Sequence, residues 1–220
     1  MLRNIRIYSL ISLCLYTWYI IVLWGVMNPN VCLEYRLYYL ERKLTDWPGY
    51  GGLKYRFGEV LSYGTRESEG KRAKNRGLGW AVAEEWGAWT LGENADLYFT
   101  LNDVPDSDLN LVMKATSFSP GGRLTVDVFG NENYLGTLSI EHLAPQEYYL
   151  TIPARLATGT PFHLQFVIHN PSSPQRQGLS SDKRLLGLGL HWVKIVPCKQ
   201  FHFLSDRNGP NSRLGFDTVI

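Results

Sequence analysis

The sequence predicts a mainly β protein: an antiparallel two-sheet sandwich of jelly-roll type, preceded by one transmembrane helix and a short juxtamembrane helix. Two observations support this prediction. The run from Ile7 to Met27 contains no charged residue and is long enough to cross a hydrocarbon core of ~30 Å as a helix. From Lys54 onward, short runs of alternating apolar and polar residues are separated by turn residues, which is typical of strands that bury one face.

The apolar run is expected to be an uncleaved signal anchor. Arg3 and Arg6 precede it, so the positive-inside rule predicts a single-pass protein with a cytoplasmic N-terminus and everything after Met27 outside. A cleaved signal peptide is the alternative, but the run is too long for one, and residues 25–30 offer no small-residue cleavage site. The first expected partner is therefore the lipid bilayer, contacted through Ile7–Met27.

A second short helix is expected after the breaker at 28–30. Leucines recur three or four residues apart between Val31 and Leu44, with charged residues among them, which is helical spacing for a segment near a membrane surface. Glycines and proline from Asp46 to Gly52 end it. The chain thus divides into a cytoplasmic tip and anchor (1–28), a juxtamembrane helix and linker (29–53), the sandwich (54–198) and a polar tail (199–220).

Charge and cysteines limit the possible functions. Arg3 and Arg6 account for the net charge of +2, so the remainder is neutral and has no basic face for nucleic acid. A local basic run, with Lys71, Arg72, Lys74 and Arg76, could contact anionic headgroups or an acidic polymer, although a solvated loop is the more common outcome. Cys32 and Cys198 lie outside the membrane and could form a disulfide. These two distant cysteines and the five scattered histidines are too few ligands for a metal site.

The strands are predicted by their period of two. In Leu109, Leu111 and Met113 the apolar side chains share one face while polar residues occupy the other. The residues Gly130–Asn133 tolerate the left-handed backbone conformation that a tight hairpin needs. The remaining runs follow at spacings of ~8–12 residues without a convincing helix, which favours a sandwich. The expected strands are Tyr55–Tyr63, Ala95–Leu101, Leu109–Ser119, Arg123–Phe129, Tyr134–Ile140, Glu147–Ile152, Phe162–His169 and Leu185–Val196.

The stretch from Gly79 to Thr90 is rich in large aromatic and charged side chains: Trp80, Trp86, Trp89, Glu84 and Glu85. Large aromatic rings either anchor a core or offer a stacking platform to a flat-faced ligand such as a sugar. Core or rim packing is the usual fate of such rings and is expected for Trp86 and Trp89. A neighbouring carboxylate is expected to accept an indole or backbone N–H.

The Trp86-Gly-x-Trp89-Thr90 element, and Asp182-x-Arg184-x-Leu186-Gly187 near the other end, resemble the β-sandwich domain attached to bacterial membrane glycosyltransferases and polysaccharide-assembly proteins. The similarity covers roughly Tyr55 to Val196. It implies a location at the bacterial inner membrane with the domain in the periplasm or outside the cell. A multi-pass membrane glycosyltransferase or polysaccharide-assembly protein is the implied partner. This chain differs from the larger members because it has one predicted span instead of a catalytic bundle.

The favoured function is a membrane-anchored, non-catalytic carbohydrate-binding or accessory subunit of polysaccharide or glycoconjugate biosynthesis or export. A glycan or glycolipid would then stack on a tryptophan and hydrogen-bond to nearby polar groups. The candidate ligand-binding residues are Trp80, Glu84, Trp89, Asn131, Asp182 and Arg184. A structural alternative is that Arg184 pairs with Glu84, while Asp182 fixes the turn before the last strand.

Two other functions stay open. One is a pure assembly subunit that docks on a multi-pass membrane partner through its aromatic-rich anchor and juxtamembrane segment. The other, less favoured, is a glycan hydrolase. Adjacent Glu84 and Glu85 point to opposite faces of an extended strand, and a nearby arginine would keep a carboxylate ionised. No catalytic motif or cofactor-binding motif stands out, so neither cofactor nor metal is expected.

Overall fold

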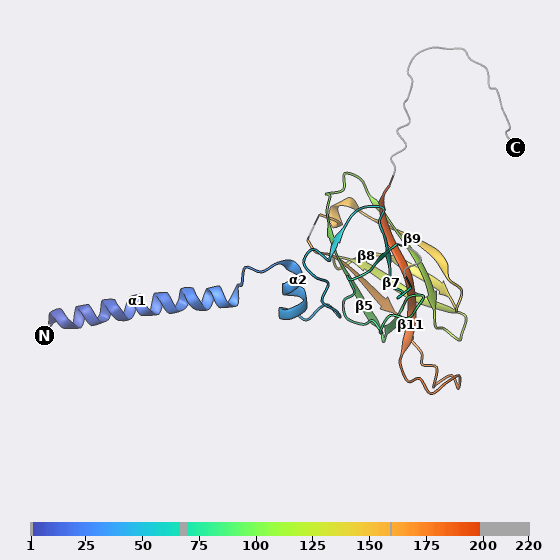
Figure 1. Cartoon of the computed structure of the whole chain (residues 1–220), viewed down its shortest axis with the longest axis horizontal. Helices are drawn as coiled ribbons and strands as arrows, with labels where there is room; N and C mark the ends of the chain where they lie inside the picture. The colour runs from blue at the N-terminus through green and yellow to red at the C-terminus, as the bar shows by residue number, and fades with distance from the viewer. Residues whose placement is uncertain (1, 67–69, 159, 199–220) are drawn as a thin grey trace, which may run out of the picture.

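The computed structural model describes residues 2–66, 70–158 and 160–198, with side chains from residue 8 onward. The first element, α1 (Leu2–Met27), points away from the rest of the chain (Figure 1). Its apolar part, Tyr8–Met27, is long enough to span a membrane, and none of it is buried inside the protein. A membrane anchor and a signal sequence both fit these properties, whereas a core helix does not.

The juxtamembrane segment is shorter than predicted. The helix α2 (Leu33–Tyr35) runs directly into a π-helical turn, η1 (Arg36–Leu40), and helical structure ends there. Leu37 is buried with Leu44 and Leu53 against Tyr98 of the sandwich. Leu44 also forms an isolated β-bridge with Gly77, which explains why the leucine spacing does not continue as helix. The segment is therefore packed onto the domain.

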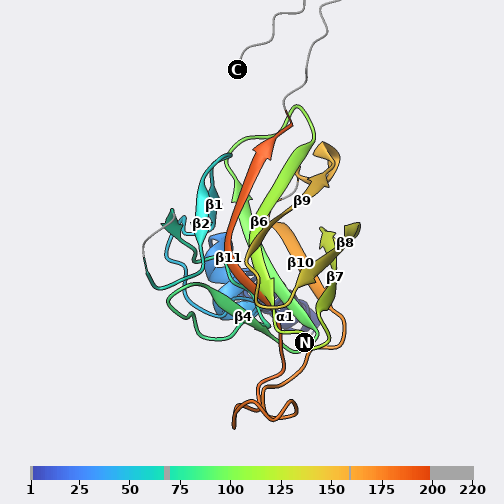
Figure 2. The same cartoon turned by 90° about the vertical axis from the view of Figure 1, so that its right-hand side faces the viewer.

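The domain is a sandwich of two sheets (Figures 1 and 2). The first has the order β1 (Lys54–Tyr55), β5 (Asn94–Leu101), β10 (Phe162–Ile168), β7 (Arg123–Gly130) and β8 (Asn133–Glu141). The second has the order β3 (Lys71–Arg72), β2 (Val60–Ser62), β11 (Leu186–Pro197), β6 (Leu109–Ser117) and β9 (Gln146–Ile152), and β4 (Ala88–Leu91) also pairs with β11. Most pairings are antiparallel; β1–β5 and β2–β3 are parallel. A 3₁₀ turn, η2 (Ala154–Leu156), follows β9.

The core lies between the two sheets and is built from the predicted inward faces. Leu109, Leu111 and Met113 of β6 face Leu164 and Phe166 of β10, and all five are buried in one cluster. Removing this apolar surface from water stabilises the fold by ~25 cal/mol per Å². The mainly β sandwich predicted from period-two patterning is confirmed.

The remaining sequence predictions concern one hairpin, one strand, the cysteines and the C-terminal tail. Asn131 and Glu132 have φ of 46° and 64°, as the tight β7–β8 hairpin requires. The predicted strand Tyr55–Tyr63 is instead two short strands, β1 and β2, separated by a turn. Cys32 and Cys198 are free, so the possible disulfide does not form in this structure. The predicted tail, 199–220, lies outside the described residues.

Candidate functional site

Trp80 is a core residue. Its side chain lies at the edge of the loop before β4, yet the residue is only 5% exposed. The indole stacks nearly parallel to Tyr63, with ring centroids 5.9 Å apart, and meets Phe166 edge-on. Its Nε1–H donates to the Asp96 carbonyl at 2.8 Å. Both the ring faces and the polar group are thus occupied by the protein itself.

Trp86 and Trp89 pack against the second sheet. Their rings are 5.0 Å apart in an edge-to-face pair, and Trp89 also meets Phe118. Trp89 is buried, whereas Trp86 is half-buried. The Nε1–H of Trp86 donates to the Glu84 carboxylate at 2.9 Å, so the expected carboxylate acceptor is present. This arrangement is core and rim packing.

Asp182 and Arg184 form a local pair near Glu84. The Arg184 guanidinium donates to Asp182 from Nε and Nη2, with the shortest distance 2.7 Å, whereas its Nη2 lies 3.9 Å from Glu84 Oε1. Hydrogen bonds from Arg184 lower the pKa of the Asp182 carboxyl. The Arg184 and Glu84 side chains are 44% and 39% exposed, so this contact is a surface ion pair that contributes ~0–1 kcal/mol, less than a buried clamp would.

Asn131 is fixed by the hairpin that contains it. Its Oδ1 accepts the backbone N–H of His163 at 2.9 Å, and its Nδ2 donates to the Leu156 carbonyl at 2.7 Å. Both ends of the amide therefore serve the fold. Of the six predicted residues, Glu84, Asp182 and Arg184 lie together, and none of the six lines either of the two clefts described below.

A concave site that the sequence prediction missed lies beside Trp47. This cleft, called the Trp47 cleft, has a volume of about 310 Å³. Three separate segments line it: the linker, the β3 region and the loop after Trp80. Its functional side chains are Asp46, Trp47, Thr65, Arg72, Lys74 and Arg76, with Val82 and Ala83 closing one side.

One wall of the Trp47 cleft is a fixed ion pair. Arg76 Nη2 lies 2.9 Å from Asp46 Oδ2, and Nη1 donates to the Ala81 carbonyl at 2.9 Å. The Arg76 side chain is only 13% exposed. The planar guanidinium is held through Nη1 and Nη2, which fixes its orientation. Its hydrogen bond orients the Asp46 carboxylate, which stays open to solvent.

Another part of the cleft lining is aromatic. Trp47 is half-buried among Tyr38, Tyr39 and Tyr50, with ring centroids 5.4–5.7 Å away. Tyr35 extends this cluster through a contact with Tyr39 at 4.7 Å. Edge-to-face and tilted contacts of this kind stabilise the ring orientations. The indole thus contributes a preformed apolar surface to the cleft.

Two cations remain available in the Trp47 cleft. Arg72 and Lys74 are exposed, and neither has an ion-pair partner within the described residues. Together with Arg76 they face one carboxylate among the lining residues, Asp46, so the described lining has more positive than negative side chains. An apolar ring face, a carboxylate and two cations without an ion-pair partner among the described residues suit a ligand that has an apolar side, hydroxyl groups and a negative charge.

Sequence comparisons identify no relative: no protein-family model matches the chain, and no curated protein matches it significantly. Within the described residues, no group of three His, Cys, Asp or Glu side chains could hold a metal ion. The Trp47 cleft could not be read from spacing, because Trp47 stands in a Pro/Gly turn and the cations in an apparent surface loop. The aromatic residue beside a lone carboxylate, Asp46-Trp47, was the available signal.

Several solved structures match part of this chain at low sequence identity. A carbohydrate-binding module CBM36 in complex with calcium and xylotriose is 14% identical, with a TM-score of 0.34, over 62% of this chain and 98% of that one. A family 6 carbohydrate-binding module is 6% identical, with a TM-score of 0.40, over 66% and 98%. The Cry4Aa toxin of Bacillus thuringiensis is 8% identical, with a TM-score of 0.41, over 67% and 25%. Because these TM-scores are low, the assignment of a sandwich is based on the strand pairing of this chain itself.

Proposed function

We propose that the protein is a membrane-anchored, non-catalytic module that binds an anionic carbohydrate in the Trp47 cleft. The observation that supports this most is the meeting of Trp47, the Asp46–Arg76 pair and the exposed cations Arg72 and Lys74 in one concavity. The C–H face of a pyranose ring stacks on an indole. Asp46 accepts hydroxyl hydrogen bonds, and Arg72 and Lys74 bind a carboxylate or phosphate on the sugar.

Binding fits this cleft better than hydrolysis does. Glycosidases need two carboxyl groups ~5–9.5 Å apart, one of them protonated. Asp46 is the one carboxylate among the lining residues, and it is already paired with the Arg76 guanidinium. Glu84 and Glu85 are engaged elsewhere, with Trp86 and Arg66. The cleft therefore supports recognition of a sugar and offers no acid–base pair.

We further propose that α1 is retained as an anchor in a bacterial inner membrane, with the domain in the periplasm or outside the cell. There the module would serve polysaccharide or glycoconjugate biosynthesis or export beside a multi-pass glycosyltransferase or assembly protein. The unburied apolar helix and the closeness of the Trp47 cleft to the anchor in sequence support this arrangement. A cleft near the membrane is well placed for a glycan that is made there.

A second candidate function is that of an assembly subunit that docks on a membrane partner. The observation in its favour is the exposure of the tyrosines around Trp47, among them Tyr39 and Tyr50. Exposed aromatic patches often mark interfaces. The two functions differ in whether the Trp47 cleft accepts a sugar in the isolated protein.

Titration of the detergent-solubilised full chain with a uronic-acid oligosaccharide and with its neutral counterpart tests the proposal. Calorimetry should show saturable binding of the acidic probe, about tenfold weaker in Trp47→Ala because the ring on which the sugar would stack is lost. The double variant Arg72→Gln/Lys74→Gln should lose the preference for the acidic probe. Tyr149→Ala and Arg155→Gln remove an exposed aromatic and an exposed cation elsewhere, and should bind like the parent.

Two outcomes would reject the Trp47 cleft as the sugar site. One is the absence of saturable binding of the acidic oligosaccharide to the parent protein. The other is equal weakening by Trp47→Ala and Tyr149→Ala. If a membrane partner co-purifies with the parent while no sugar binds, the assembly function replaces the binding function.

A further inference from the structure

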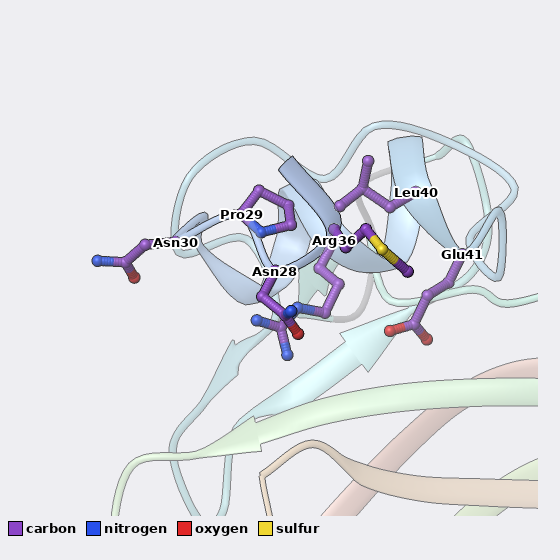
Figure 3. A pocket seen from close by; sticks show the side chains of 7 residues that line it. Asn28, Pro29, Asn30, Arg36, Leu40 and Glu41 are labelled. Carbon is purple, nitrogen blue, oxygen red and sulfur yellow. The ribbon is translucent and has the colours of Figure 1, made fainter. Parts of the chain in front are cut away.

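A second cleft lies where α1 meets the juxtamembrane segment (Figure 3). It has a volume of about 480 Å³, and its lining includes Met27, Asn28, Asn30, Arg36, Leu40 and Glu41. We infer that this cleft binds the phosphate group of a membrane phospholipid. The inference requires that α1 is retained as the anchor, but it is independent of sugar binding in the Trp47 cleft.

The position of the cleft along the membrane normal supports this assignment. The apolar part of α1 ends at Met27, and the next three residues, 28–30, are Asn-Pro-Asn. A span of this length places its last residue at the edge of the hydrocarbon core. Residues 28–30 and the side chain of Arg36 then lie at the depth of the phospholipid headgroups. The cleft opens at the level where phosphate groups are concentrated.

Two polar side chains of the lining have hydrogen-bond donors without a partner in the part of the chain that the structure describes. Within the described residues, the side chains of Arg36 and Asn30 make no hydrogen bond or ion pair. Glu41 is the one carboxylate in the lining, and Lys43 already pairs with it at 2.8 Å. The Asn28 side chain donates to the Trp24 carbonyl at the end of α1. Arg36 therefore supplies an unbalanced positive charge and a planar donor fork that matches a phosphate.

The apolar lining favours a lipid over a free anion. Met27 is 72% exposed and Leu40 is 51% exposed, and both border the same cleft as Arg36. A free phosphate would leave these two side chains in water. A phospholipid would cover them with its glycerol and upper acyl chains while its phosphate contacts Arg36.

Native mass spectrometry of the detergent-solubilised full chain tests the inference directly. The protein is incubated with phosphatidylglycerol or with diacylglycerol that carries the same acyl chains but no phosphate. The parent should retain phosphatidylglycerol, and Arg36→Gln should lower the retained fraction about fivefold, the effect of one cation near an anionic lipid. Arg42→Gln removes an exposed neighbouring cation that does not line the cleft, and should bind like the parent. Circular dichroism verifies that both variants are folded.

Four results would overturn the phospholipid assignment. Equal losses in Arg36→Gln and Arg42→Gln would show a general charge effect. Retention of diacylglycerol as strong as that of phosphatidylglycerol would show apolar binding alone. Displacement by a large excess of inorganic phosphate would identify a free-anion site. An intact mass lacking α1 would show that the mature chain has no such cleft. Unchanged lipid binding in Trp47→Ala would separate this site from the sugar site.

Discussion

The hydroxyl group of Tyr55 joins the two sheets. Tyr55 belongs to β1, and its oxygen accepts the backbone N–H of Ile195 in β11 at 2.7 Å while it donates to the Glu59 carbonyl at 2.6 Å. The residue is 1% exposed, and burial raises the pKa of its phenol to about 12. The folded state thus keeps a proton that the unfolded state releases near pH ~10.

This linkage predicts alkaline destabilisation. The contribution of Tyr55 to the free energy of unfolding is intact below pH ~10. It falls by ~1.4 kcal/mol per pH unit as the pH rises toward about 12. Tyr55→Phe should flatten that part of the slope. At neutral pH it should cost ~1–3 kcal/mol, because the Ile195 N–H is left without an acceptor. Denaturant unfolding at a series of pH values measures both effects. An unchanged alkaline slope in the variant would contradict the assignment.

The residue scale also shows where sequence reasoning succeeds. The Glu84 acceptor for a tryptophan N–H was predictable because the two residues are two positions apart in the chain. The exposure of Arg184 was not, since burial depends on what the rest of the fold places above it. The same holds for the Trp47 cleft, because Arg72 and Lys74 join Trp47 there from another segment of the chain.

At the scale of elements, β11 depends on two positions without side chains. A Cβ at Gly189 would lie 2.8 Å from Trp86, Trp89 and Thr116. The strand is central in its sheet, where it pairs with β2, β4 and β6. Gly187 is similarly close to Ile168 on the other side. The two glycines let one strand contact the core and the tryptophan pair at the same time.

Gly189→Ala should therefore destabilise the sandwich by ~1–3 kcal/mol, because overpacking forces both indoles to move. Gly121→Ala is the matched control, since a Cβ there meets nothing within 4 Å. The midpoint of chemical unfolding, followed by circular dichroism, measures both variants. The packing argument fails if the two substitutions have the same effect.

Elements were predictable in proportion to their length and to the asymmetry of their two faces. β7 and β10 have eight and seven residues and alternate between buried and more exposed positions, so period two identifies them. β1 and β3 have only two residues each, too few for a local sequence pattern. They are strands because β1 pairs with β5 and β3 pairs with β2. The juxtamembrane helix is cut short because Leu44 pairs with Gly77.

At the scale of the whole molecule, both proposed sites depend on which side of the membrane the domain occupies. The cleft at the end of α1 and the Trp47 cleft both follow the span in sequence, and Tyr39 of η1 contacts Trp47 directly. This aromatic contact links the two clefts, although sandwich residues such as Arg72 and Lys74 also line the Trp47 cleft. A sugar and a lipid phosphate would therefore be bound on the same side of the membrane, close to its surface.

Cysteine accessibility measures that side. Arg3 and Arg6 precede the span, so the positive-inside rule predicts that Cys32, which is exposed before α2, lies outside the cytoplasm. In a Cys198→Ser variant, Cys14 lies within α1 and is shielded by lipid. A membrane-impermeant maleimide should then label sealed right-side-out vesicles, and Cys32→Ser/Cys198→Ser should abolish the labelling. Labelling that appears only after the vesicles are inverted would place the domain in the cytoplasm. That result would remove the proposed role outside the cytoplasm while leaving the geometry of both clefts unchanged.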